Sequence, residues 1–208
     1  MQDGDVIFDI GAGIGWYSLN FSKRFPQSTV YAFEPIKGLF QILTTNVDNN
    51  KANNIKTFNY GIANKEGSQD FYYLKNQHEY LRNILEPMEQ KCRVRTLQGI
   101  VNDLNINKLD LIKQELKVQE DAFLVEGRDV VNQFKPLVMF SLREYWDKEL
   151  IKTFEEDIQI LEKIGYRKVI IGESIKKNLT REKHYFFYHP SKHKNININT
   201  DLENRLIQ

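Results

Sequence analysis

The chain has 208 residues, of which 41% are hydrophobic, and its formal net charge at pH 7 is +1. This length suits one domain with a full hydrophobic core, while Cys92, the only cysteine, excludes an internal disulfide and suits a reducing compartment. The balanced charge gives no strong attraction to nucleic acid or to an anionic membrane, no N-terminal signal is visible, and no apolar run approaches the roughly 20 residues that span a bilayer. We therefore expect a cytoplasmic protein that acts on a small molecule.

The first third of the chain alternates strand and helix patterns. Short apolar runs rich in β-branched and aromatic residues predict strands, and apolar residues that recur on one face predict helices. In chain order these patterns predict a strand at Val6–Ile10, a helix at Trp16–Arg24, a strand at Thr29–Phe33, a helix at 37–50, a strand at 55–63, a turn at 64–67 and a strand at 68–74.

The middle of the chain is less regular. Residues 75–92 lack a clear period and carry many polar groups, so we predict a loop or lid there. Gly165 follows a long amphipathic segment, at the position of a helix C-cap. The remaining predicted elements are a short strand at 93–97, a short helix at 99–104, strands at 109–116 and 136–142 around a helix at 122–134, a helix at 147–164, and strands at 166–172 and 184–190 joined by a polar connection at 173–183.

This order of elements predicts an α/β fold. Strands that alternate with helices favour a doubly wound, mostly parallel, Rossmann-like sheet covered on both faces. The last two strands have no helix between them, so we expect an antiparallel terminal hairpin. Residues 1–190 would form this domain, and residues 191–208 would form a polar C-terminal tail.

The stretch "VIFDIGAGIGWYSL" places Gly11, Gly13 and Gly15 directly after the first strand. In open parallel sheets, ligands bind beyond the carboxyl ends of the strands. A glycine-rich turn at that place lets a ligand approach the backbone, with the N–H groups of the next helix behind it. The plain alternative is a tight strand-to-helix turn without a ligand. The three glycines, together with Asp9 and Glu34, favour a cofactor site.

Two classes of cofactor compete for this turn. A dinucleotide site usually reads Gly-x-Gly-x-x-Gly, and the position of its third glycine is Trp16 in this chain. A bulky indole is a poor neighbour for a pyrophosphate, so NAD or a nucleotide sugar is disfavoured. Glu34, at the end of the second strand, can hold ribose hydroxyls in either class. The spacing of the glycines favours S-adenosylmethionine (SAM).

The segment "FDIGAGIGWYSLNFSKRFPQSTVYAFEP" resembles the first half of the FkbM-type methyltransferases, a branch of the class I SAM-dependent fold. The similarity continues through "NVDNNKANNIKTFNYGIANKEGSQDFYYL", "VRTLQGIVNDLNINKLDLIK" and "KPLVMF", and covers most of residues 4–145. It implies a SAM-dependent enzyme that O-methylates a hydroxyl of a sugar or another small molecule. The cofactor-binding residues that the resemblance implies are Asp9, Gly11, Ala12, Gly13, Gly15 and Trp16 around the turn, Glu34 at the ribose, and Pro35, Ile36, Asn59, Gly61 and Ile62 around the adenine.

The chain departs from the family after its fourth predicted parallel strand, at "KQELKVQED". The family usually has Asp-x-Glu-Gly there, with a further glutamate two residues later. This end of the strand normally faces the transferring methyl, so the acceptor side is altered. In this chain Glu115 replaces the aspartate, Lys117 the glutamate and Val118 the glycine, Glu120 matches the later glutamate, and Gln98 and Ser141 replace acidic residues elsewhere. The family's usual upstream helix is also missing, which indicates a fragment or a minimal version.

Glu115 is the candidate general base for a hydroxyl acceptor. The competing interpretation is an ion pair of Glu115 with Lys113 or Lys117 at the strand end. If the altered motif no longer supports catalysis, the chain is a SAM-binding module that acts as a partner or regulatory subunit. His189 and His193 have the spacing of metal ligands, but Pro190 breaks the helix that would align them, so we expect no metal. The sequence leaves the oligomeric state open.

Overall fold

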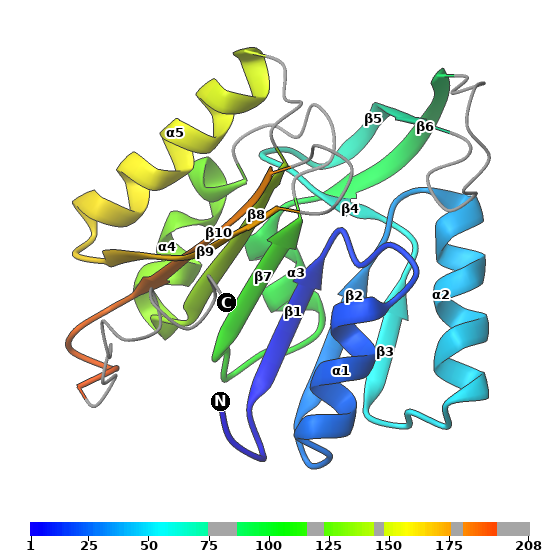
Figure 1. The fold of residues 1–208 in the computed structure, drawn as a ribbon, viewed down its shortest axis with the longest axis horizontal. Helices are drawn as coiled ribbons and strands as arrows, with labels where there is room; N and C mark the ends of the chain where they lie inside the picture. Colours follow the sequence, from blue (N-terminus) through cyan, green and yellow to red (C-terminus); the bar gives the residue numbers. More distant parts are fainter. Residues whose placement is uncertain (75–86, 116–122, 144–147, 176–180, 195–208) are drawn as a thin grey trace.

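The computed structural model describes residues 1–74, 87–115, 123–143, 148–175 and 181–194. Its main element is a sheet of seven strands in which the first five are parallel and the last two form an antiparallel hairpin (Figure 1). The predicted doubly wound sheet with a terminal hairpin is confirmed. In spatial order the strands are β3 (Ile55–Phe58), β2 (Thr29–Phe33), β1 (Val6–Ile10), β7 (Leu111–Glu115), β8 (Leu137–Arg143), β10 (Arg181–Tyr188) and β9 (Arg167–Ile175).

Helices cover both faces of this sheet (Figure 1). Because side chains alternate along a strand, Ile7 of β1 packs into one core with α1 and α2, whereas Phe8 packs into the other with α3, α4 and α5. Leu43, fully buried on α2, belongs to the first core, and Phe154 on α5 belongs to the second. The helices are α1 (Trp16–Arg24), α2 (Lys37–Asn49), α3 (Leu97–Asp103), α4 (Leu124–Phe134) and α5 (Lys148–Lys163).

A second, three-stranded sheet lies beyond the carboxyl ends of the main strands, near one end of α2 (Figure 1). It divides the predicted strand 55–63, because the chain bends at Asn59 and Tyr60 and its remainder pairs with a different sheet. The predicted loop at 75–92 is wrong for residues 87–92, which pair along their whole length; residues 75–86 lie outside the described part. The three strands are β4 (Gly61–Ile62), β6 (Pro87–Arg95) and β5 (Gly67–Leu74).

Strand β6 is polar, yet it has a buried face. Cys92 and Val94 point inward and pack against Phe71 and Ile36, whereas their neighbours Lys91 and Arg93 are exposed. This short alternation was hidden by the charged residues around it. The following helix α3 begins two residues earlier than predicted, where the Thr96 hydroxyl accepts a hydrogen bond from the Gly99 amide at 3.1 Å.

The C-terminal hairpin extends further than its sequence indicates. The predicted polar connection at 173–183 is wrong at both ends, because Glu173–Ile175 pair with Arg181–Lys183; residues 176–180 are not among those described. Gly165, with a φ of 92°, ends the turn after α5 as predicted. Within the described ranges, no helix is long and apolar enough to cross a membrane.

The two ends of the described chain meet at Asp110, just before β7. One carboxylate oxygen of Asp110 accepts a hydrogen bond from the Val6 amide at 2.9 Å, and the other lies 3.3 Å from the Lys192 ammonium. Lys192 also donates to the carbonyl of Phe134 at the end of α4, at 2.8 Å. These contacts attach residue 192, in the predicted tail, to the main domain, whereas residues 195–208 lie beyond the described part.

Candidate functional site

The glycine turn joins β1 to α1 at the carboxyl edge of the sheet. Gly11 has a φ of 68°, and a Cβ atom there would lie 2.8 Å from the backbone carbonyl oxygen of Glu115. Gly15 has a φ of 93°, and a Cβ atom there would lie 2.8 Å from the Leu43 side chain on α2. Both positions therefore require glycine, the first for close approach to β7 and the second for packing of α1 against α2. Ala12 completes the turn by donating its amide to the carbonyl of Phe33, at 2.9 Å.

Glu34 connects this turn to the end of β2. Its side chain is buried, with an exposed fraction of 2%. One carboxylate oxygen accepts a hydrogen bond from the Gly13 amide at 2.7 Å, and the other accepts one from the Ile36 amide at 2.9 Å. The carboxylate predicted to bind ribose is thus held next to the glycine turn.

The residues predicted around the adenine come together beside Glu34. The Asn59 side-chain amide donates to the carbonyls of Glu34 and Pro35, at 2.9 and 3.1 Å. Gly61 lies close to Pro35, because a Cβ atom on Gly61 would be 3.5 Å from the Pro35 ring. Ile36 and Ile62 are both buried. Asn59 therefore holds the backbone after β2 in place, next to the residues predicted to border the adenine.

Asp9 lies in the protein interior beneath the turn. Its side chain is fully buried, and one carboxylate oxygen accepts a hydrogen bond from the Ser18 hydroxyl at 2.6 Å. The other oxygen is 3.0 Å from the ammonium of Lys113, which is also fully buried. The resemblance implies direct contact of Asp9 with the methionine end of SAM. In the structure Asp9 contacts protein groups, so its influence on a ligand at the turn passes through Ser18 and Lys113.

Lys113 was named from the sequence as a possible ion-pair partner of Glu115, but its complete burial and its contact with Asp9 were not predicted. Its ammonium lies 3.6 Å from a carboxylate oxygen of Glu115 and 4.5 Å from the centre of the Tyr17 ring. Burial alone would lower the pKa of Lys113, but the charges of Asp9 and Glu115 outweigh it and raise the pKa above its ordinary value. Lys113 is therefore protonated at neutral pH. The sequence feature that could have indicated this buried lysine is its position in the middle of an otherwise apolar strand pattern.

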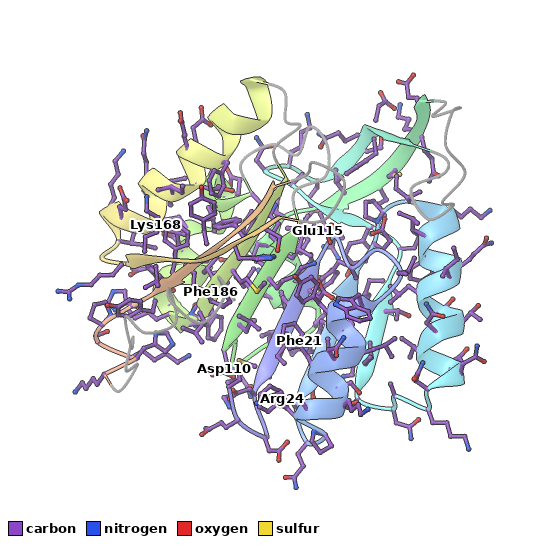
Figure 2. The ribbon with its side chains drawn as sticks, in the orientation of Figure 1. Phe21, Arg24, Asp110, Glu115, Lys168 and Phe186 are labelled. Atoms are coloured by element: carbon purple, nitrogen blue, oxygen red, sulfur yellow. The ribbon has the colours of Figure 1, made fainter. Side chains whose placement is uncertain are left out.

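Glu115 ends β7 at the carboxyl edge of the sheet, where Figure 2 labels it. The ion pair with Lys113 is the competing interpretation named from the sequence, and the structure contains it. In register, Glu115 pairs with Ser141 of β8, which pairs with His184 of β10. The Ser141 hydroxyl lies 3.0 Å from Nδ1 of His184. The substitutions at Lys117, Val118 and Glu120 lie outside the described residues.

The remaining predicted features are Trp16 and the pair of His189 and His193. Trp16, the first residue of α1, is 70% exposed and lines a groove between α1 and the α2–β3 connection. His189 donates its backbone amide to Nδ1 of His193, at 3.1 Å. Among the described residues, no group of three or more His, Cys, Asp or Glu side chains could hold a metal ion.

The arrangement of strands and helices is that of the class I methyltransferase fold, with its Rossmann-like sheet. SMU.1697c from Streptococcus mutans, solved in complex with S-adenosylhomocysteine (SAH), superimposes with a TM-score of 0.57 at 8% identity, over 90% of each chain. Precorrin-6y C5,15-methyltransferase from Geobacter metallireducens superimposes with a TM-score of 0.55 at 14% identity, over 91% of this chain and 81% of the other. At these identities the similarity shows the fold alone.

Sequence comparison finds relatives that match only part of this chain, and no protein-family profile matches it. The AMB antimetabolite synthetase AmbE of Pseudomonas aeruginosa is 26% identical over 173 residues, which is 61% of this chain and 8% of AmbE. Methyltransferase sdnD of Sordaria araneosa is 32% identical over 77 residues, which is 36% of this chain and 30% of sdnD. The chain thus spans less than a third of the length of these curated relatives.

Proposed function

We propose that the protein is a SAM-dependent methyltransferase that O-methylates a hydroxyl of a sugar or another small molecule. The observation that carries the proposal is the buried carboxylate of Glu34, hydrogen-bonded to the Gly13 amide at the carboxyl ends of adjacent parallel strands. This is the place where open parallel sheets bind ligands. The fold, and the methyltransferases among the partial relatives, support the choice of SAM over other ligands of such sheets.

We infer how the described residues would hold SAM from their places around the glycine turn and Glu34. Glu34 would accept hydrogen bonds from the ribose hydroxyls, while Pro35, Ile36 and Ile62 would border the adenine. The turn would receive the methionine part at Gly13, which carries no side chain, has a φ of 60° and lies beside Glu34. Bound SAM supplies a methyl group activated by its sulfonium. The protein's task is then to align the acceptor and exclude water.

Glu115 is proposed as the catalytic residue of the acceptor side, because its backbone borders the glycine turn at Gly11. The acceptor is proposed to be small and uncharged or weakly charged, since the chain has a net charge of +1 and no strongly basic balance. A cytoplasmic location belongs to the same proposal. The second candidate function is a SAM-binding module without catalysis. It is favoured by the 3.6 Å contact of Glu115 with Lys113, which occupies the candidate base.

Isothermal titration calorimetry of the purified protein with SAH and with NAD tests the cofactor. We expect micromolar binding of SAH and no binding of NAD. Gly13→Val should abolish SAH binding, since the valine side chain would fill the space proposed for the methionine part of the cofactor. Gly4→Val is the matched control, because Gly4 also has a positive φ, 84°, with open space around it, but precedes β1 at the opposite edge. Equal affinities of wild type and Gly13→Val, or binding of NAD, would refute the assignment.

A further inference from the structure

A groove of about 880 Å³ lies between α1 and the connection from α2 to β3. Its volume is within the range of ligand-binding clefts, about 300–1,000 Å³. All the residues that line it belong to 16–26 and 50–54, where the chain is described without a gap. We refer to this feature as the α1 groove. Of the residues predicted to bind the cofactor, only Trp16 lines it, so it is a separate place from the glycine turn.

The floor of the α1 groove is held by side chains of the protein itself. The Asn54 side chain donates to the carbonyl of Ser28 at 2.9 Å and accepts the Ser22 hydroxyl at 2.5 Å. These bonds attach the end of α1 to the residue before β3. Leu19 and Ala52, both half-buried, also line the groove and pack on the core beneath it. The groove is therefore formed in advance, and a ligand does not have to order it.

Two asparagines at the rim offer acceptor atoms to a ligand. The Asn20 side-chain nitrogen donates to the carbonyl of Trp16 at 2.7 Å, and that of Asn50 donates to the carbonyl of Asn46 at 2.8 Å. Since each nitrogen is directed to its own helix, the side-chain oxygens are left to accept hydrogen bonds. An amide oxygen accepts a bond from a hydroxyl group and repels a phosphate oxygen. These asparagines therefore favour a ligand rich in hydroxyl groups over a nucleic acid backbone.

Trp16 supplies an apolar surface beside these acceptors. Its side chain is 70% exposed, although tryptophan is usually largely buried in folded proteins. Trp16, Asn20 and Lys23 are spaced four and three residues apart, so they follow one face of α1. An exposed indole offers a flat surface on which the apolar face of a sugar ring can pack. The same face of the helix thus carries an aromatic ring, an acceptor and a cation.

The charge of the α1 groove is positive. Lys23 and Lys51 line it, and no aspartate or glutamate of the described chain does. Both lysines are exposed, and within the described ranges neither forms an ion pair. A ligand that carries carboxylates would therefore meet cations that no protein group neutralises.

We propose that the α1 groove binds an acidic oligosaccharide, a chain of sugar rings that carries carboxylates. The Trp16 indole packs on one sugar ring. The oxygens of Asn20 and Asn50 accept hydrogen bonds from hydroxyl groups, and Lys23 and Lys51 attract the carboxylates. The inference does not rest on the SAM-binding function, because the glycine turn takes no part in it.

Isothermal titration calorimetry with three probes tests the chemistry of the groove. Tetragalacturonate has the acidic sugar rings, its methyl ester has the same rings without charge, and tetrathymidylate has phosphates and bases instead. We expect wild type to bind tetragalacturonate about fivefold more tightly than the ester, and to bind tetrathymidylate least. Trp16→Ala should weaken both saccharides about tenfold. Lys23→Gln combined with Lys51→Gln should lower the affinity for tetragalacturonate to that for the ester and leave the ester unchanged.

Arg24→Gln is the control, because Arg24 is an exposed cation next to Lys23 but does not line the groove. It should leave all three affinities unchanged. The double lysine variant should bind SAH as wild type does, which separates this site from the proposed cofactor site. Failure of wild type to bind tetragalacturonate, or equal losses in Arg24→Gln and the double lysine variant, would overturn the inference. Tighter binding of tetrathymidylate would also overturn it, in favour of a nucleic acid ligand.

Discussion

Replacing Lys113 by methionine tests the buried ion pair beneath the glycine turn. Both partners are fully buried, and the two charged atoms lie 3.0 Å apart, so the variant leaves the Asp9 carboxylate in the interior without its cation. Removing one partner of a buried pair typically costs about 3–5 kcal/mol of unfolding free energy. The Ser18 hydroxyl still donates to Asp9 in the variant. We therefore expect Lys113→Met to lose about 3 kcal/mol, the lower end of this range.

The matched variant is the double substitution Asp9→Asn with Lys113→Met. It removes both charges of the fully buried pair, and asparagine keeps an acceptor for Ser18, so neither fully buried position carries a charge. We expect it to be about 1–2 kcal/mol more stable than Lys113→Met alone. Urea unfolding followed by circular dichroism, with unchanged m values, measures both differences. A loss below about 1 kcal/mol in Lys113→Met, or a double variant no more stable than the single one, would refute the reasoning.

The same pair predicts how stability depends on pH. Burial lowers the pKa of Lys113, but the charges of Asp9 and Glu115 outweigh it, and the pKa rises above its ordinary value of 10.5. A raised pKa means that the folded state holds the proton more tightly than the unfolded state. The contribution is therefore fully present below pH 10.5 and is lost as the pH rises through the raised pKa. The difference between wild type and Lys113→Met should stay constant from neutral pH to about pH 10.

Three further predictions concern single residues. Glu34→Ala should weaken SAH binding by about 1–3 kcal/mol in calorimetry, and wild-type affinity would contradict the ribose assignment. Gly11→Ala should lose about 2 kcal/mol of stability in urea, because its Cβ would meet the Glu115 carbonyl at 2.8 Å, whereas Gly38→Ala, in open space on α2, should lose none. Burial raises the pKa of the Cys92 thiol to about 11, so a thiol reagent at about pH 8 should label the protein only after unfolding. Rapid labelling of the native protein would contradict this.

Sequence periodicity predicted the elements whose patterns are local. The bounds of β1, α1 and β2 agree with the structure, because each has a compact apolar pattern closed by a glycine turn or a proline. The split between β3 and β4 could not be seen, since it depends on the Asn59 side chain reaching the carbonyls of Glu34 and Pro35. Only the end of strand β6, at residues 93–95, was predicted, because Cys92 and Val94 on its buried face stand among polar and charged residues.

The candidate site also has a part that the sequence predicts and a part that depends on long-range strand pairing. The glycine turn and Glu34 carry their signal in one short segment each, and they lie together as the sequence predicts. The ion pair of Asp9 and Lys113 joins two strands that are about 100 residues apart in sequence, since these residues meet only when β1 pairs with β7. Burial of a lysine is decided by such pairing, and periodicity alone does not reveal it.

Asp110 has a consequence for how the chain can be reconnected. Because this carboxylate contacts both Val6 and Lys192, the two ends of the described domain lie at the same edge of the sheet, opposite the glycine turn. A circular permutant can therefore be closed at this edge, by an added linker between the two ends of the chain. New termini at the exposed Lys51, between α2 and β3, would open the chain at that same remote edge. Such a permutant leaves β1, β2 and β7 uninterrupted, and these strands carry Asp9, the glycine turn, Glu34 and Lys113. The site can therefore form although its parts occur in a different order along the chain.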